Sequence, residues 1–349
     1  MSRAERKRDH IQHALSTDHQ GQTAFDDIVF VHHSLPNTSV EDVRLQTKIG
    51  ELTLSSPIFI NAMTGGGGEN TQKINQELAI AARETGIAIA VGSQMAAIKD
   101  PSERKTFEIV RKTNPNGVVL ANIGSEASVS QALEVVEMID ADALQIHLNV
   151  IQELAMPEGD RSFQGALERI SAISTALPIP VIVKETGFGM SAEAVSLLDQ
   201  TEVTAVDVGG FGGTNFSKIE NARRKRLVTY FDDWGIPTPI SIIEARSSFT
   251  RDVIASGGIQ TALDVIKSVA LGAKATGMAG TLLKVLVEQS LENLLEEIQG
   301  IHEDLAYLMC ALGVTKIEEL LNVPMVISGE SYHWLKVRGY KPETFARRN

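Results

Sequence analysis

One short stretch of the chain carries a dense group of polar side chains. Alternate residues of an extended strand share one face, so Gln145, His147 and Asn149 point the same way. Three polar groups packed against helices would be costly to bury, which favours a face that points into a barrel and toward its mouth. Gln152 and Glu153 follow directly. A lone histidine on a strand is usually a satisfied core residue, but with these polar neighbours we predict a functional site here.

Lys184 ends another apolar run and is followed by Glu185 and Thr186. A lysine in such a place can be a Schiff-base nucleophile, a partner for a charged ligand, or half of a salt bridge. The sequence leaves these three roles open.

Glycine-rich segments follow several of the apolar runs. Gly65 to Gly68 and Gly209 to Gly213 would let a flat or charged ligand approach the backbone closely. Residues 255–258 (ASGG) and 277–280 (GMAG) resemble the loops that bind phosphate through backbone N–H groups in many barrels. We expect a phosphorylated cofactor or substrate there, and the pattern does not say which.

Eight short apolar, β-branched runs must position these groups. Such runs are typical of parallel strands that are buried on both faces. Their repeat of about 28 residues and their number favour a (β/α)8 barrel with chemistry at the carboxyl ends of the strands. A doubly wound open sheet competes, but no G-x-G-x-x-G follows the first run. The runs span residues 57–63, 87–93, 117–124, 143–149, 180–186, 205–211, 252–258 and 275–280.

Segments with helical periodicity lie between the runs. We predict one domain over residues 1–349, with a barrel core over 57–280 and an N-terminal extension or lid over 1–56. An insertion, 212–236, follows the sixth strand. The C-terminal part, 281–349, begins with two amphipathic helices, 282–301 and 302–313, that serve packing. The barrel helices are predicted at 70–85, 128–139, 164–176, 191–200, 238–248 and 260–271.

Composition narrows the function classes. The 32 basic and 44 acidic residues give a net charge of −12, which argues against a general nucleic-acid or anionic-membrane binder. A single cysteine, Cys310, excludes a disulfide framework, and no apolar run approaches the ~20 residues of a membrane span. The N-terminus lacks the apolar core of a secretory signal, so we expect a cytoplasmic protein.

Two basic clusters stand out against the acidic total. Arg6, Lys7 and Arg8 lie beside His10 near the N-terminus, and residues 222–226 read ARRKR. The first cluster is a candidate for binding an anion. We expect the second to be a solvated surface run.

Together these motifs resemble the type 2, flavin-dependent isopentenyl-diphosphate delta-isomerases. The resemblance covers essentially the whole chain, and its most specific parts are the N-terminal Arg6-Lys7 pair and QIHLNVIQE at 145–153. The other matching pieces are SLP (34–36), NAMTGG (61–66), VGSQ (91–94), NIG (122–124), MPEG (156–159), VKETGFGM (183–190), GGTNF (212–216), ASGG (255–258) and GMAG (277–280).

The resemblance implies a TIM barrel that holds FMN at the carboxyl ends of its strands and interconverts isopentenyl and dimethylallyl diphosphate. It implies Mg²⁺ on Glu153, reduction of the flavin by NADPH or NADH, and a homo-oligomer, a tetramer or octamer. Substrate contacts would come from Arg6, Lys7, His10, Asn149 and Gln152, and the catalytic groups would be His147, Gln152 and Lys184. The flavin contacts would be Ala62, Met63, Thr64, Ser93, Asn122, Lys184 and Thr214, with Gly258, Ile259, Ala279 and Gly280 at its phosphate.

Two positions depart from the family pattern. Gly209 stands where relatives often have serine, and Met95 where many have arginine.

Two other functions compete with the isomerase interpretation. An oxidoreductase such as a hydroxy-acid oxidase could use the same FMN barrel, but it would need a His–Arg pair near the flavin, which the strand ends do not offer. A catalytically silent flavin- or phosphate-binding protein is the third possibility.

Overall fold

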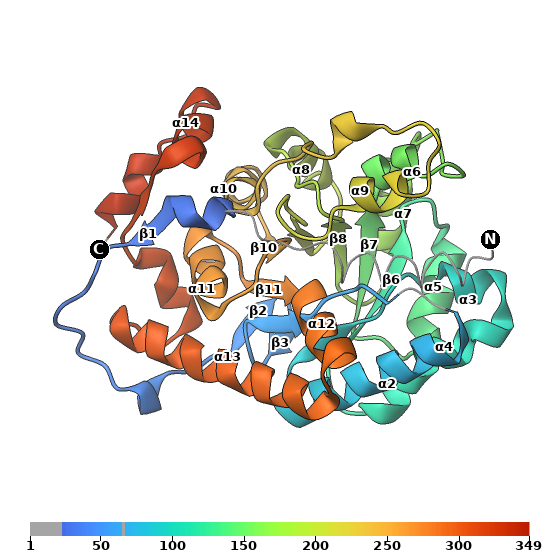
Figure 1. The fold of residues 1–349 in the computed structure, drawn as a ribbon, viewed down its shortest axis with the longest axis horizontal. Helices are drawn as coiled ribbons and strands as arrows, with labels where there is room; N and C mark the ends of the chain where they lie inside the picture. The colour runs from blue at the N-terminus through green and yellow to red at the C-terminus, as the bar shows by residue number, and fades with distance from the viewer. Residues whose placement is uncertain (1–22, 65–66, 349) are drawn as a thin grey trace.

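The computed structural model describes residues 23–64 and 67–348. Its centre is a closed barrel of eight parallel strands, in which the last strand pairs with the first (Figure 1). All eight predicted runs form these strands, so the barrel prediction is confirmed over the open-sheet alternative. The strands are β4 (Ile58–Ile60), β5 (Ala88–Ala90), β6 (Val119–Gly124), β7 (Ala143–Leu148), β8 (Val181–Glu185), β9 (Ala205–Asp207), β10 (Asp252–Ser256) and β11 (Ala275–Met278).

The strand register brings polar residues to one level near the mouth of the barrel. On β7, Gln145 pairs with Asn122 of β6, and His147 pairs with Lys184 of β8. Lys184 in turn pairs with Asp207 of β9. Residues far apart in the sequence thus meet across four neighbouring strands.

A hairpin closes the other end of the barrel. Strands β2 (Thr47–Ile49) and β3 (Leu52–Leu54) pair in antiparallel fashion before the first barrel strand. Ile49 and Leu54 are buried in one cluster with Phe59 and Leu120 inside the barrel. Burial of this apolar surface seals the amino-terminal end, so a ligand has access from the carboxyl ends of the strands.

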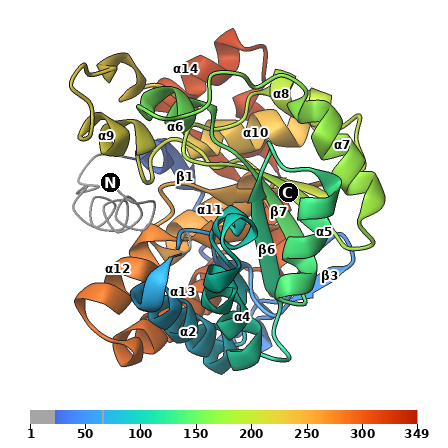
Figure 2. The same cartoon turned by 90° about the vertical axis from the view of Figure 1, so that its right-hand side faces the viewer.

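Helices surround the barrel. Figure 2 shows α2, α4 and α13 on one side of it and α8, α10 and α14 on the other. Six of the helices match the predicted segments within a few residues. The helices that follow barrel strands include α2 (Gly68–Thr85), α4 (Arg104–Thr113), α5 (Val129–Met138), α7 (Ala166–Ala176), α8 (Ala192–Leu198), α10 (Thr238–Ser248), α11 (Ala262–Leu271) and α12 (Gly280–Glu288).

The sequence analysis missed α4. Its charged residues outnumber its apolar ones. Phe107 and Val110 are fully buried, Ile109 is partly buried against the same core, and the helix packs on α2. Three apolar positions gave too short a periodic signal.

The C-terminal helices divide at a different place from the predicted one. The chain breaks at Gln289 and Ser290, and α13 (Leu291–Ala311) then runs through the predicted boundary at residue 301. The hydroxyl of Ser290 accepts a hydrogen bond from the backbone N–H of Asn293, which caps the new helix. Gly300 remains inside α13, where a side chain would meet no neighbour within 4 Å.

The C-terminal segment packs against the first strand of the described residues. Strand β12 (Met325–Ile327) pairs with β1 (Ile28–Phe30), and α14 (Gly329–Val337) follows it. Buried Glu244 of α10 accepts hydrogen bonds from Trp334 and from Arg338, which fastens this segment to the barrel helices. Among the described residues, no helix combines the length and apolar character needed to cross a membrane.

The insertion after β9, residues 212–236, lies over the carboxyl ends of the strands. Its helix α9 (Phe216–Asn221) contacts α6 (Val150–Ala155), the short helix that follows β7. The prediction that residues 222–226 form a solvated surface run is wrong for two of these residues. Arg223 bonds the carboxylates of Glu158 and Glu220, and Arg224 donates to the carbonyl of Ala155. Lys225 and Arg226 are exposed, as expected.

Candidate functional site

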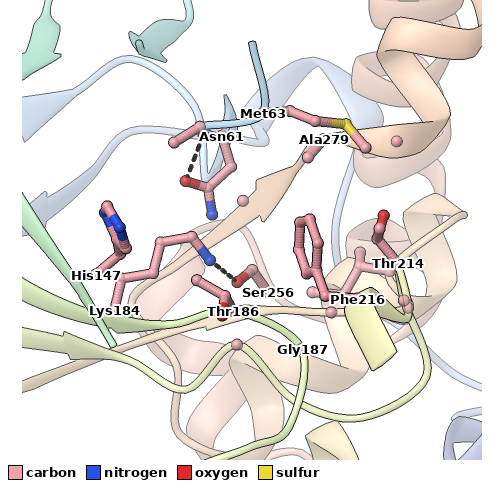
Figure 3. A pocket seen from close by; sticks show the side chains of 18 of the residues that line it. Asn61, Met63, His147, Lys184, Thr186, Gly187, Thr214, Phe216, Ser256 and Ala279 are labelled. Atoms are coloured by element: carbon pink, nitrogen blue, oxygen red, sulfur yellow. Dashed lines mark hydrogen bonds between the residues drawn. The ribbon is translucent and has the colours of Figure 1, made fainter. Parts of the chain in front are cut away.

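A cavity of about 220 Å³ opens at the carboxyl ends of the barrel strands. Figure 3 shows it with Lys184 extending toward Ser256, His147 to one side, and Thr214 and Phe216 on the other. Twelve residues that the sequence analysis assigned to a site line this one cavity. They are Ala62, Met63, Ser93, Asn122, His147, Gln152, Lys184, Thr214, Gly258, Ile259, Ala279 and Gly280.

Lys184 is the one cation among the described residues that line the cavity. Its side chain is only 8% exposed. The ammonium donates to the Ser256 hydroxyl at 3.2 Å and to the Glu185 carbonyl at 2.8 Å, and it lies 3.6 Å from a carboxylate oxygen of Asp207. A salt-bridge role is therefore present, and it holds the charge at the cavity wall.

Asp207 is the residue that the sequence analysis missed here. It is fully buried, and its carboxylate accepts hydrogen bonds from Ser256 at 2.6 Å, from Asn61 at 2.8 Å and from the backbone of Gly209 at 3.2 Å. The signal was an acidic residue between Val206 and Val208 in a buried strand, because a carboxylate in such a place requires partners.

His147 and Gln152 reach the cavity from β7 and from α6. A chain of buried carboxamides joins the imidazole of His147 to Asp207 on the other side of the barrel mouth. Its members are Asn122, Gln145 and Asn61, each at most 3% exposed.

Asn149 and Glu153 lie beside the cavity rather than in its lining. The Asn149 amide donates to one carboxylate oxygen of Glu153 at 2.9 Å, and the backbone N–H of Asp160 donates to the other at 2.8 Å. Partial burial raises the pKa of the Glu153 carboxyl above its ordinary value, against the opposing effect of these two bonds. Within residues 23–64 and 67–348, no group of three or more His, Cys, Asp or Glu residues could by itself hold a metal ion.

Thr64 also lies outside the cavity lining. It is 3% exposed, and its hydroxyl bonds to the carboxamide of Asn75 in α2, which in turn donates to the Thr106 carbonyl. This hydroxyl connects the loop after β4 to two helices. Arg6, Lys7 and His10 fall outside the described residues.

One end of the cavity has the features of a phosphate site. Helix α12 begins there, at Gly280, with Ala279 as an N-cap that has no side-chain hydrogen bond. Helix α11, by contrast, is capped by its own Thr261 and Asp264. The first N–H groups of an α-helix have no partner within the helix, and together with the helix dipole they attract an anion.

The loops around this end pack backbone against backbone. Gly257 has φ +97°, and a Cβ there would overlap the carbonyl oxygen of Gly210. The buried Nε2 of Gln260, another lining residue, has no hydrogen-bond partner among the described residues. An unpartnered donor beside an uncapped helix start indicates a bound acceptor group.

The two departures from the family pattern have structural reasons. Gly209 adopts φ +46°, and a Cβ there would overlap the Glu185 carbonyl oxygen, so serine does not fit this backbone. Met95 is 4% exposed and packs in the hydrophobic core, not at the cavity.

Phe216, Thr186 and Gln260 also line the cavity, and none of them was assigned a role from the sequence. Thr186 is the last residue of the predicted strand 180–186, and Gln260 lies two residues beyond the predicted strand 252–258, so strand ends were a usable signal. Phe216 belongs to the insertion, whose path over the barrel no local pattern reveals.

Comparison with known proteins places this barrel in a class. The profile of the FMN-dependent dehydrogenase family matches residues 147–326. A mandelate oxidase mutant with a monooxide FMN adduct superimposes with a TM-score of 0.65, at 15% identity over 92% of each chain. A flavocytochrome b2 mutant with sulfite bound gives a TM-score of 0.66, at 18% identity over 89% of this chain and 81% of that one. At such identities the structural likeness shows the fold alone.

Closer relatives define the family. Isopentenyl-diphosphate delta-isomerases of Geobacillus sp. (strain WCH70) and Bacillus pumilus (strain SAFR-032) are 58% and 57% identical to this chain. The first covers 100% of both sequences, and the second covers 97% of this chain and 96% of the relative. The chain belongs to the isopentenyl-diphosphate delta-isomerase family, in its FMN-dependent, type 2 form.

Glu185 makes the free energy of unfolding depend on pH. Burial raises the pKa of its carboxyl from 4.5 to about 8, although the Phe188 backbone N–H donates to it at 2.6 Å. Between these two values the unfolded chain has released a proton that the folded chain still holds. The contribution of Glu185 to the free energy of unfolding therefore falls as pH rises through this window, by a few kcal/mol.

We predict that Glu185→Gln removes this contribution. Urea unfolding followed between pH 5 and pH 8 should show a shallower loss of stability with rising pH than the unsubstituted protein does. Exposed Glu137, replaced by Gln, is the control for losing one carboxyl group. An unchanged slope in Glu185→Gln would show that Glu185 is ionised in the folded protein at neutral pH.

Proposed function

We propose that this chain interconverts isopentenyl diphosphate and dimethylallyl diphosphate with reduced FMN and Mg²⁺. The observation that carries the proposal is the convergence of three features in one cavity. These are the buried ammonium of Lys184, the polar pair of His147 and Gln152, and the uncapped start of α12. The reaction adds a proton to the terminal alkene carbon and removes one from C2, so it needs no net oxidation.

The lining residues fit FMN. The N–H groups at Ala279 and Gly280, the loop at Gly258 and Ile259, and the unpartnered donor of Gln260 would hold its phosphate. Ala62, Met63, Ser93, Asn122 and Thr214 lie in the same cavity, so they would contact the ring and its ribityl chain, with Thr64 placed as a support behind them.

Reduced FMN, when bound, would supply an electron-rich ring and a transferable proton. Lys184 would balance negative charge on that ring, because its ammonium stays at the wall through Ser256 and Asp207. We therefore propose a charge-partner role for Lys184 in addition to the salt bridge with Asp207. NADPH is the proposed source of electrons.

His147 and Gln152 would face the substrate. Both line the cavity from one strand-to-helix connection, where they would orient the alkene and take part in proton movement. Exclusion of water around this pair would protect a cationic intermediate. The N-terminal Arg6, Lys7 and His10 are proposed diphosphate contacts that fall outside the described residues.

Glu153 suits Mg²⁺ as a single protein ligand. Mg²⁺ commonly binds one or two carboxylates and completes its shell with water and substrate phosphates. The Glu153 carboxylate, oriented by Asn149, would therefore need the diphosphate to complete the site. This agrees with finding no larger acidic or histidine cluster among the described residues. A cytoplasmic location and a homo-oligomer stay predictions.

A flavin oxidoreductase is the second candidate, favoured by the match to the FMN-dependent dehydrogenase profile. The cavity argues against a hydroxy-acid oxidase, because its described lining contains no arginine to pair with His147. Absorbance spectra of the purified flavoprotein decide between the two. Isopentenyl diphosphate should be converted with no net change in the flavin spectrum. Steady bleaching of oxidised flavin by a 2-hydroxy acid would support the oxidoreductase instead.

A further inference from the structure

The carboxamides between Asp207 and His147 form one unbroken hydrogen-bonded chain across the barrel mouth. Asn61 Nδ2 donates to Asp207 at 2.8 Å, and Gln145 Nε2 donates to Asn61 Oδ1 at 3.1 Å. Asn122 Nδ2 donates to Gln145 Oε1 at 3.2 Å, and Asn122 Oδ1 lies 2.9 Å from His147 Nδ1.

The orientation of the first amide in the chain is fixed from two sides. An ionised carboxylate only accepts hydrogen bonds, so Asn61 must turn its NH₂ group toward Asp207. A backbone N–H only donates, and that of Ala62 meets Asn61 Oδ1 at 2.8 Å. Both neighbours demand the same orientation, so Asn61 cannot flip without losing two buried hydrogen bonds.

This orientation determines the remaining members in turn. Asn61 presents its oxygen to Gln145, so Gln145 must donate there with its NH₂ group and present its own oxygen to Asn122. Asn122 must then donate to Gln145 and turn its oxygen toward His147. An oxygen that only accepts requires a proton on the facing ring nitrogen.

We propose that Asn61, Gln145 and Asn122 are positioning residues that fix neutral His147 as the Nδ1–H tautomer. Nε2 is then the ring nitrogen that carries the lone pair, and proton exchange at His147 occurs there. The role assigned to His147 in catalysis rests on the proposed function, whereas its tautomer follows from the hydrogen bonds alone. The chain also links His147 to the carboxylate that holds Lys184, so one buried network orients both groups.

Gln145 offers the sharpest test because two substitutions separate polarity from packing. Gln145→Met keeps an unbranched side chain of similar length but leaves Asn122 Nδ2 without its acceptor, so Asn122 is no longer held in one orientation. Gln145→Glu keeps an oxygen that accepts from Asn122 Nδ2, whether its carboxyl is protonated or ionised, so Asn122 keeps its orientation toward His147. Asn114→Leu removes a buried carboxamide at the end of α4, outside this network, and is the matched control.

The measurement is nitrogen-15 NMR of the FMN-loaded protein labelled at histidine, at about pH 8.5, roughly two units above the ordinary histidine pKa. His147→Gln identifies the His147 signals. We expect the Nδ1–H tautomer in the unsubstituted protein, in Gln145→Glu and in Asn114→Leu, and loss of that single tautomer in Gln145→Met.

Two results would overturn the inference: an Nε2–H tautomer in the unsubstituted protein, or an unchanged Nδ1–H tautomer in Gln145→Met. A misfolded Gln145→Met protein is recognised by loss of its flavin, and the first result decides the question without that variant. Because the spectrum reports a proton position and not turnover, it remains decisive even if the proposed isomerase activity is not found.

Discussion

Lys184→Met is expected to lower isomerase activity by about 10²–10³-fold, the usual effect of removing one preorganised charge or donor from an active site. Methionine preserves most of the side-chain volume but cannot donate to Ser256 or offset charge on a bound flavin. The rate of dimethylallyl diphosphate formation at saturating FMN measures the effect. Activity within tenfold of the unsubstituted protein would contradict the charge-partner role.

A second variant separates this role from stability. Lys184→Met alone leaves buried Asp207 without its cation, and breaking a buried pair in this way costs about 3–5 kcal/mol. Adding Asp207→Asn removes the uncompensated charge and should recover much of the free energy of unfolding. Activity should stay low in the double variant. Recovery of activity together with stability would mean that Lys184 acts only through folding.

Glu153→Gln is expected to weaken Mg²⁺ activation by about 10–100-fold, measured as the Mg²⁺ concentration for half-maximal rate. The carboxamide still accepts hydrogen bonds from Asn149 and Asp160 but carries no charge for the metal. Asp160→Asn is the matched control, because it removes a neighbouring exposed carboxylate and keeps the backbone N–H that Glu153 uses. An unchanged rate and an unchanged metal dependence in Glu153→Gln would contradict the role of Glu153 as the metal ligand.

Because the pKa of Glu153 is raised, the effect of Mg²⁺ on the rate should depend on pH. Protons compete with Mg²⁺ for the carboxylate, so at low Mg²⁺ the rate should decline as pH falls through the raised pKa. More Mg²⁺ should move that decline to lower pH in the unsubstituted protein and should not do so in Glu153→Gln.

The barrel could be predicted from the sequence because each strand is a separate, locally visible signal. Residues buried on both faces, such as Val183 and Ile146, leave a continuous apolar run that polar helices interrupt. Helix α4 was not predicted because only three of its ten residues, Phe107, Ile109 and Val110, are apolar. The break between the C-terminal helices was predicted at residue 301 because the apolar periodicity continues past Ser290. In the structure the Ser290 cap starts a new helix earlier.

The site could be predicted only where residues follow strand ends. Lys184 and His147 were found that way. Asp207 was not, because its importance comes from partners on β8, on β10 and directly after β4 that are distant in sequence. For the same reason, the solvated interpretation of Arg223 failed: its two carboxylate partners come from different segments, 65 and three residues away.

The most direct test of the account is an anaerobic conversion assay. Protein, FMN, Mg²⁺ and dithionite are combined with isopentenyl diphosphate, and dimethylallyl diphosphate is measured over time. The account predicts product that requires the protein and the reduced flavin, and that falls sharply in Lys184→Met. No dimethylallyl diphosphate from the complete reduced mixture would contradict it.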